Sequence, residues 1–171
     1  MPVDFFDNPC ACSTQKERFG LCDDVAAVDC PTNPAYIDEN NEDDWTADVT
    51  NEKQRVVTFY PIDNCIDIRR DNGDMDNRCD GMLVNDDELL FVELKDRDSH
   101  KWIAKGREQL EVTIGNFKKA HDIGLYKRVA AYLCNKQRPR VVVSCPNELQ
   151  KFYDNTGYQL IVDRNIKIFG N

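Results

Sequence analysis

The sequence has no long apolar run and no leader-like start, and both absences limit where the protein can work. Without a stretch of about 18 consecutive apolar residues, a transmembrane helix is excluded. The first residues lack a basic start followed by an apolar segment, so we expect no signal peptide. We therefore expect a cytoplasmic protein that has no membrane partner.

Several motifs that mark common enzyme classes are also missing. The sequence has no glycine-rich phosphate-binding loop, no dinucleotide-binding glycine motif and no nucleophile elbow of the G-x-S-x-G type. It contains only two histidines, His100 and His121, and they are not spaced as a pair of metal ligands. Nucleotide-binding and serine-hydrolase chemistry therefore have no support in the sequence.

Charge is distributed unevenly along the 171 residues, whose formal net charge is −9. Residues 1–50 contain 12 acidic residues against Lys16 and Arg18, whereas residues 51–171 contain 19 acidic and 20 basic residues. Residues 101–140 hold ten basic residues opposed by only three acidic ones. The pI near 4.7 taken alone argues against a nucleic-acid partner, but the basic stretch restores that class of partner.

The same asymmetry divides the chain into two predicted parts. Residues 1–50 are predicted to be an irregular, acidic, cysteine-containing segment, in which a short helix around 14–28 is the one regular element. Residues 51–171 are predicted to be the core domain, because β-branched and aromatic residues recur from about residue 55. A chain of this length buries enough surface to fold without a metal or a disulfide.

Hydrophobic periodicity in the core domain predicts a mixed α/β fold. Helices are predicted over 100–122, with Ser99 as the N-cap, and over 147–154. A turn is predicted over 71–74 and a hairpin turn over 85–88. The last two predicted strands are expected to form a terminal hairpin. Strands are predicted over 55–60, 65–69, 80–84, 89–95, 127–134, 140–143, 158–162 and 165–169.

Two acidic residues and a lysine stand out in the predicted hairpin. Glu93 and Lys95 are two residues apart on a strand, so both side chains point to one face. Hairpin turns of two or four residues both pair residues whose numbers add to 173, which places Asp80 opposite Glu93. A turn of three residues would shift the register by one and send Asp80 to the other face. The apolar residues of the strand are expected to face a core on its other side (Leu90, Val92, Leu94).

Two carboxylates so close together repel each other, and a cation relieves that repulsion. Oxygen ligands suit Mg²⁺ or Mn²⁺, and Mg²⁺ favours one or two protein carboxylates completed by water and phosphate oxygens. We therefore expect Asp80 and Glu93 to hold the metal. Such a metal activates water for attack on a phosphate, and Lys95 beside it would assist the attacking water.

These residues resemble the PD-(D/E)XK nuclease superfamily, which has the restriction-endonuclease-like fold. The resemblance rests on Asp80, a hairpin, Glu93-Leu94-Lys95 and a following helix, and it covers about residues 55–134. It implies a central mixed sheet flanked by helices, a divalent metal and a catalytic lysine. Some members carry a glutamine on the helix, and Gln109 matches it, with Lys105 one turn before on the same face.

The sequence departs from the pattern of this family at two points. Cys79 stands where the family has proline. The family often has an acidic residue on a helix before the first strand, and Glu52 is the nearest candidate, with Asp63 and Asp67 as others.

The leading hypothesis is therefore a Mg²⁺-dependent nuclease, either an endonuclease or an exonuclease, that acts on DNA in preference to RNA. Asp80, Glu93, Lys95 and Gln109 are its predicted catalytic residues. The alternative is an inert nuclease-fold module that binds a protein or a nucleic acid through its surface. A third reading is a structural α/β protein in which the E-x-K residues form a surface ion pair. A homodimer or a protein partner fits each of these hypotheses.

Eight cysteines are a high number for a chain of this length. Cys10, Cys12, Cys22 and Cys30 follow a C-x-C-x9-C-x7-C spacing, and four thiolates could hold Zn²⁺ or an iron–sulfur cluster. The alternatives are free, partly buried thiols, or disulfides, which need an oxidising compartment. The other four mostly lie in apolar runs and are expected to be buried thiols (Cys65, Cys79, Cys134, Cys145).

Overall fold

A computed structural model describes residues 2–23, 33–96, 101–137 and 145–169 of the chain. The helices of these residues are α1 (Trp102–Ala120), α2 (Pro146–Thr156) and the 3-10 turns η1 (Glu42–Asp44) and η2 (Ile123–Leu125). The strands are β1 (Cys12–Thr14), β2 (Arg18–Cys22), β3 (Tyr36–Asp38), β4 (Ala47–Thr50), β5 (Val57–Pro61), β6 (Gly81–Val84), β7 (Glu88–Lys95), β8 (Arg128–Asn135), β9 (Gln159–Val162) and β10 (Asn165–Lys167). The predicted mixed α+β class is confirmed.

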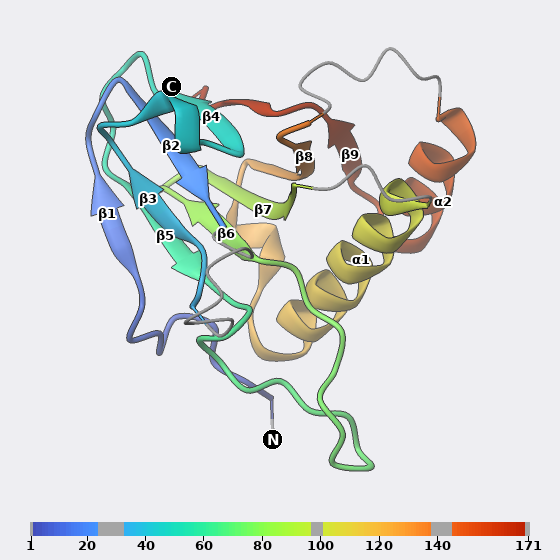
Figure 1. The fold of residues 1–171 in the computed structure, drawn as a ribbon. Coiled ribbons are helices and arrows are strands. Elements are labelled where there is room, and N and C mark those ends of the chain that lie inside the picture. Colours follow the sequence, from blue (N-terminus) through green and yellow to red (C-terminus); the bar gives the residue numbers. More distant parts are fainter. Residues whose placement is uncertain (1, 24–32, 97–100, 138–144, 170–171) are drawn as a thin grey trace.

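The strands form two mixed sheets. The larger has the order β1-β5-β6-β7-β8-β9, in which β7, β8 and β9 run parallel and the other neighbours are antiparallel. The smaller has the order β10-β4-β2-β3, with only β10 and β4 parallel. Figure 1 shows α1 and α2 on one side of the larger sheet and β2, β3 and β4 on the other.

The alternation of side chains along the central strands builds a core on each face of the larger sheet. On one face Leu90, Val92 and Leu94 of β7 pack against buried residues of the smaller sheet such as Phe19. On the other face Phe91 packs with residues of α1 and α2. Both faces of β7 are therefore buried, as expected for a strand next to a parallel neighbour.

Helix α1 connects the parallel strands β7 and β8, and its apolar stripe explains its position. Leu110, Ile114 and Phe117 are spaced at helical intervals and are all buried. A Cβ atom at Gly106 would lie 2.4 Å from Cδ1 of Leu133, so only glycine lets the start of α1 approach β8 this closely. The helix thereby holds its first turns against the carboxyl ends of β7 and β8.

The amino-terminal segment is not irregular, and the described part of its predicted helix is strand β2. Residues 12–50 contribute β1 to the larger sheet and β2, β3 and β4 to the smaller one. Buried and partly buried residues alternate along β4, as in a strand with one face on the core. Both sheets take strands from each side of the boundary predicted at residue 50.

Four other predictions of local structure were not confirmed. The predicted strand over 65–69 is absent, and Arg69 forms only an isolated bridge with Met75. The predicted terminal hairpin is wrong, because β9 pairs with β8 and β10 pairs with β4. The predicted strand over 140–143 and the predicted cap Ser99 lie outside the described residues, and the N-cap of α1 is Lys101.

None of the helices in the described part of the chain combines the length and the apolar character needed to cross a membrane.

Candidate metal centre

The register of the β6–β7 hairpin is the one predicted from the sequence. Gly81 pairs with Val92 and Val84 pairs with Leu89, so paired numbers add to 173. Four residues lie between Val84 and Leu89, which is one of the two turn lengths for which the sequence predicted this register. Asp80 directly precedes β6 and Glu93 lies in β7, so continuing the register brings these two residues opposite each other on the helix-covered face.

Both carboxyl groups are buried, at the open end of the β6–β7 hairpin. Asp80 is 8% exposed and Glu93 is 1% exposed. Oδ2 of Asp80 accepts a hydrogen bond of 2.6 Å from the backbone N–H of Leu94, the residue next to Glu93. Oε2 of Glu93 has no hydrogen-bond partner among the described residues, although it is fully buried. A buried carboxylate oxygen without a donor is costly, and it marks a position where a cation would fit.

Burial raises the pKa of both acids. Burial raises the pKa of Asp80 well above its usual range, and the neighbouring charge of Glu93 raises it further. Burial raises the pKa of Glu93 to about 7, although the charge of Lys95 and its hydrogen bond act in the opposite direction. Two desolvated carboxyl groups that repel each other form the electrostatic environment that a divalent cation relieves.

Lys95 connects the acid pair to helix α1. Its Nζ lies 2.5 Å from Oε1 of Glu93 and donates a hydrogen bond of 2.7 Å to Oε1 of Gln109. The amide nitrogen of Gln109 in turn donates to the backbone carbonyl of Arg78, two residues before Asp80. The structure therefore brings together all four residues that the sequence singled out, although Gln109 contacts the lysine and the chain before β6 rather than a carboxylate.

A second contact from the same helix was not predicted. The hydroxyl of Thr113 accepts a hydrogen bond of 2.8 Å from the backbone N–H of Cys79, and both groups are buried. Thr113 lies four residues after Gln109, on the same face of α1. From the sequence, the four-residue spacing from Gln109 could have indicated that Thr113 lies on the same face of the helix. Together the two side chains fasten the segment 78–79 to the helix and so position Asp80.

Among the candidate upstream acids, Asp63 is the one that acts on the pair. Its charge raises the pKa of Glu93, and its carboxylate forms an ion pair of 2.8 Å with Arg78. Asp23, which the sequence did not single out, raises the pKa of Asp80. Glu52 and Asp67 are not among the charges that shift the pKa of either acid.

The donor set of Asp80 and Glu93 fits a hard divalent cation. In residues 2–23, 33–96, 101–137 and 145–169, no three His, Cys, Asp or Glu side chains gather closely enough to hold a metal ion. A site that binds the metal entirely through protein ligands is therefore not formed there. Mg²⁺ requires only one or two carboxylates when water and substrate phosphates supply the remaining oxygens.

The predicted cluster of four thiolates is not formed by the described cysteines. Cys10 is joined to Cys65 by a disulfide, with 6.3 Å between their Cα atoms, so Cys65 is not the buried thiol expected. Cys12 is exposed on an edge strand, and Cys22 is buried on β2. Cys30 lies outside the described residues, so binding of Zn²⁺ or an iron–sulfur cluster remains a prediction.

Both members of the disulfide are held by the loop that precedes β1. Asn8 donates to the carbonyl of Pro61 at 2.6 Å, which places Cys10 beside the residues that follow β5. A separation of 55 residues hides this contact from the sequence. Cys79 and Cys134 are buried free thiols, as predicted.

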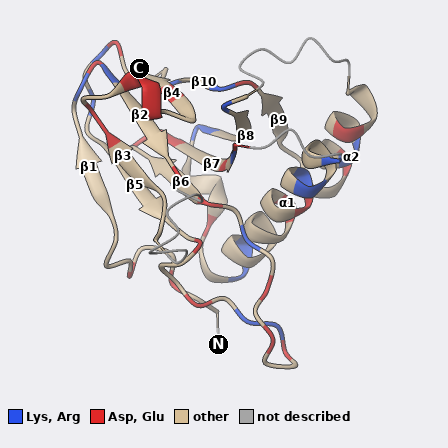
Figure 2. Cartoon of the chain, in the orientation of Figure 1, with Lys and Arg blue, Asp and Glu red and all other residues tan. Residues whose placement is uncertain are grey.

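The basic stretch over 101–140 is less available to a ligand than its charge count implies. Figure 2 shows lysine and arginine residues along α1, close to acidic residues. Arg107 is buried and contacts three carboxylates at 2.6 to 3.3 Å, which makes it a structural residue. Lys101 and Lys105, in the first turns of α1, are exposed. Two further basic residues pair with acids of the β6–β7 turn and β7 (Lys127, Arg128).

Comparisons with protein-family models, with curated proteins and with solved structures found no match to this chain.

Proposed function

We propose that this chain is a metal-dependent nuclease that hydrolyses phosphodiester bonds in DNA, with the active-site pattern of the PD-(D/E)XK superfamily. The observation that carries the proposal is the buried, unpartnered Oε2 of Glu93 beside the buried carboxyl group of Asp80. An acid pair that only stabilised the fold would be expected to have donors for each buried oxygen.

In the proposed site Asp80 and Glu93 bind Mg²⁺ or Mn²⁺. When bound, the metal lowers the pKa of a water ligand and offsets negative charge on a phosphate. Lys95, held between Glu93 and Gln109, keeps a positive charge beside the place where that phosphate charge develops. Gln109 is a positioning residue, because it contacts Lys95 and the backbone of Arg78.

Two exposed lysines at the start of α1 could contact the phosphates of the DNA backbone. Lys101 is the N-cap of α1 and Lys105 lies one turn before Gln109, so both charges belong to the half of the helix that carries Gln109. Contacts of this kind make binding sensitive to salt and add no sequence specificity.

The test is cleavage of linear double-stranded and single-stranded DNA with Mg²⁺ or Mn²⁺. We expect Glu93→Gln and Lys95→Ala to lower the cleavage rate by about a hundredfold or more, because each removes stabilisation of charge at the reacting phosphate. The matched control is Glu108→Gln, which removes a carboxylate from the exposed side of α1. Cleavage that survives both active-site substitutions would contradict the proposal.

Metal binding is measured separately through protein stability. Mg²⁺ at ten times its Kd should raise the unfolding free energy of the wild type by about 1.4 kcal/mol and leave Glu93→Gln unchanged. Stabilisation by the metal without cleavage of either DNA favours the inert binding module. If neither cleavage nor stabilisation is seen, the nuclease and the metal site are both wrong.

A further inference from the structure

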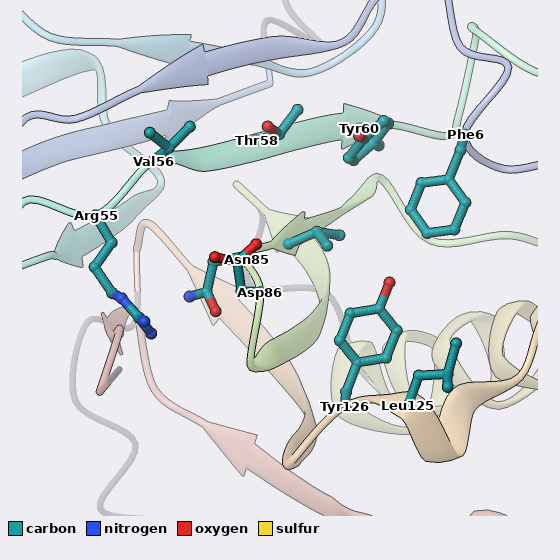
Figure 3. A pocket seen from close by; sticks show the side chains of 10 residues that line it. Phe6, Arg55, Val56, Thr58, Tyr60, Asn85, Asp86, Leu125 and Tyr126 are labelled. Atoms are coloured by element: carbon teal, nitrogen blue, oxygen red, sulfur yellow. The ribbon is translucent and has the colours of Figure 1, made fainter. Parts of the chain in front are cut away.

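A cavity of about 610 Å³ lies away from the acid pair, over β5, β6 and the segment that follows α1. Figure 3 shows side chains from these elements pointing into it. Its volume is within the range of about 300–1,000 Å³ that is typical of small-molecule sites. It is lined by Phe6, Arg55, Val56, Thr58, Tyr60, Val84, Asn85, Asp86, Leu125 and Tyr126.

Six of the ten side chains that line this cavity are aromatic or aliphatic, although polar atoms form the larger share of its exposed lining. The rings of Phe6 and Tyr60 meet edge to face, with centroids 5.2 Å apart, and so fix each other's orientation. Tyr126 follows η2 on the opposite wall and is half-buried. Burial raises the pKa of Tyr126, and the nearby hydroxyl of Tyr60 raises it further. Leu125 is 75% exposed at the rim, where an apolar ligand could cover it.

The polar side chains of Arg55, Thr58 and Asn85 already have partners within the protein. The guanidinium of Arg55 forms an ion pair of 2.9 Å with Asp87, and the hydroxyl of Thr58 shares a hydrogen bond with Ser13. In the described residues, no hydrogen bond is formed by the hydroxyl of Tyr60, that of Tyr126 or the carboxylate of Asp86. The free polar groups are therefore two phenols and one exposed acid.

The charge of the lining selects against strongly charged ligands. One basic and one acidic side chain line the cavity, and the basic one already has its own carboxylate partner. A phosphate would meet no free cation there. A simple organic cation would leave the two phenol hydroxyls without acceptors.

We propose that this cavity binds a planar heteroaromatic ring of the nucleobase class. The flat ring would stack on one of the two perpendicular rings of Phe6 and Tyr60 and lie against Tyr126. Its ring nitrogen or carbonyl atoms would accept from the phenols, and its amino groups would donate to Asp86. Rings that stack on aromatic side chains and also carry acceptors and donors satisfy every free group in the cavity.

The cavity and the acid pair belong to the same face of the larger sheet. Asp80 and Val84 are four residues apart along β6, which corresponds to about 14 Å. The two sites share no lining residue, so the inference does not depend on the proposed nuclease. The ring could come from a free nucleoside or from an unpaired base in a strand.

Calorimetric titrations in EDTA, which prevents metal-dependent cleavage, test the proposal with two probes, adenosine and a six-nucleotide deoxyadenylate. Tyr126→Ala should weaken binding at least about fivefold, since stacking on one aromatic ring is lost. Tyr126→Phe keeps the ring and should weaken it about threefold. Tyr153→Ala, which removes an exposed tyrosine from α2 outside the cavity, is the matched control.

Each outcome decides the proposal. Weakening of adenosine binding by Tyr126→Ala supports a free nucleoside, and weakening of oligonucleotide binding alone supports a base in a strand. Binding of neither probe, equal binding by wild type and both variants, or binding of benzyl alcohol as tight as that of adenosine would overturn it. Thermal unfolding of each variant detects a folding defect. If Tyr126→Ala is misfolded, the comparison of Tyr126→Phe with the wild type decides the proposal.

Discussion

Strand β7 begins with one buried glutamate, Glu88, and carries a second, Glu93, two residues before its end, and their surroundings differ. Glu88 is 2% exposed, and Glu93 is 1% exposed. The carboxylate of Glu88 accepts hydrogen bonds from Asn85, Arg128 and the backbone of Phe169. Glu93 has Lys95 at one oxygen and no partner among the described residues at the other.

The two pKa values move in opposite directions because of these partners. Burial acts to raise the pKa of Glu88, but the hydrogen bonds from Asn85 and Arg128 outweigh it and hold that pKa below its usual range. For Glu93 burial prevails and raises the pKa. Similar solvent exposure thus goes with opposite pKa shifts, because Glu93 lies deeper in the protein and has fewer donors than Glu88.

The largest expected effect comes from removing each charge in turn. Glu88→Gln should lower the unfolding free energy by about 2 kcal/mol, because charge-assisted hydrogen bonds are lost and Arg128 loses its ion pair with Glu88. Glu93→Gln should change it by less than about 1 kcal/mol, because it removes a charge that is costly to bury. Urea unfolding measures both. Equal destabilisation by the two substitutions would show that the glutamates play the same role.

A pH series sharpens the comparison at Glu88. Its folded-state pKa lies below the unfolded value, so it adds stability above about pH 4.3, and this contribution is lost as pH falls through the folded-state pKa. The wild type should therefore lose more stability than Glu88→Gln between about pH 6 and pH 3. Urea unfolding across this range measures the difference, and parallel curves for the two proteins would contradict it.

The smallest effect is expected at the glutamine that supports Lys95. Gln109→Ala should lower stability by about 1 kcal/mol, because it removes two partly buried hydrogen bonds. The matched control is Gln150→Ala on α2, where the lost hydrogen bond to Asp154 is exposed and the cost should be under about 0.5 kcal/mol. Thermal unfolding compares the two. A larger loss of stability in Gln150→Ala than in Gln109→Ala would contradict the positioning role of Gln109.

The described structure brings the four predicted site residues together, because local rules governed most of them. The hairpin turn sets the register, and the register sets which side chains face each other across β6 and β7. The helix containing Gln109 was visible in its apolar spacing. Asp63 was one of three upstream acids that the sequence left open, whereas Thr113 was missed because its contact with Cys79 joins segments that are distant in sequence.

The amino-terminal segment shows where such rules fail. Short strands such as β1 and β3 have three residues each, too few for a periodic signal. Their partners lie far along the chain, as in the pairing of Cys12 with Phe59. The disulfide of Cys10 with Cys65 and the separation of β9 from β10 follow from the same long-range pairing.

By itself the sequence determined the mixed fold class, the register of the β6–β7 hairpin and the opposition of Asp80 and Glu93, since each depends on residues close together in the chain. Only the tertiary structure decided that Oε2 of Glu93 lacks a donor among the described residues while Glu88 has three. Two of the three donors to Glu88 come from β8 and from the segment after β10, and no local pattern records which buried acid they reach.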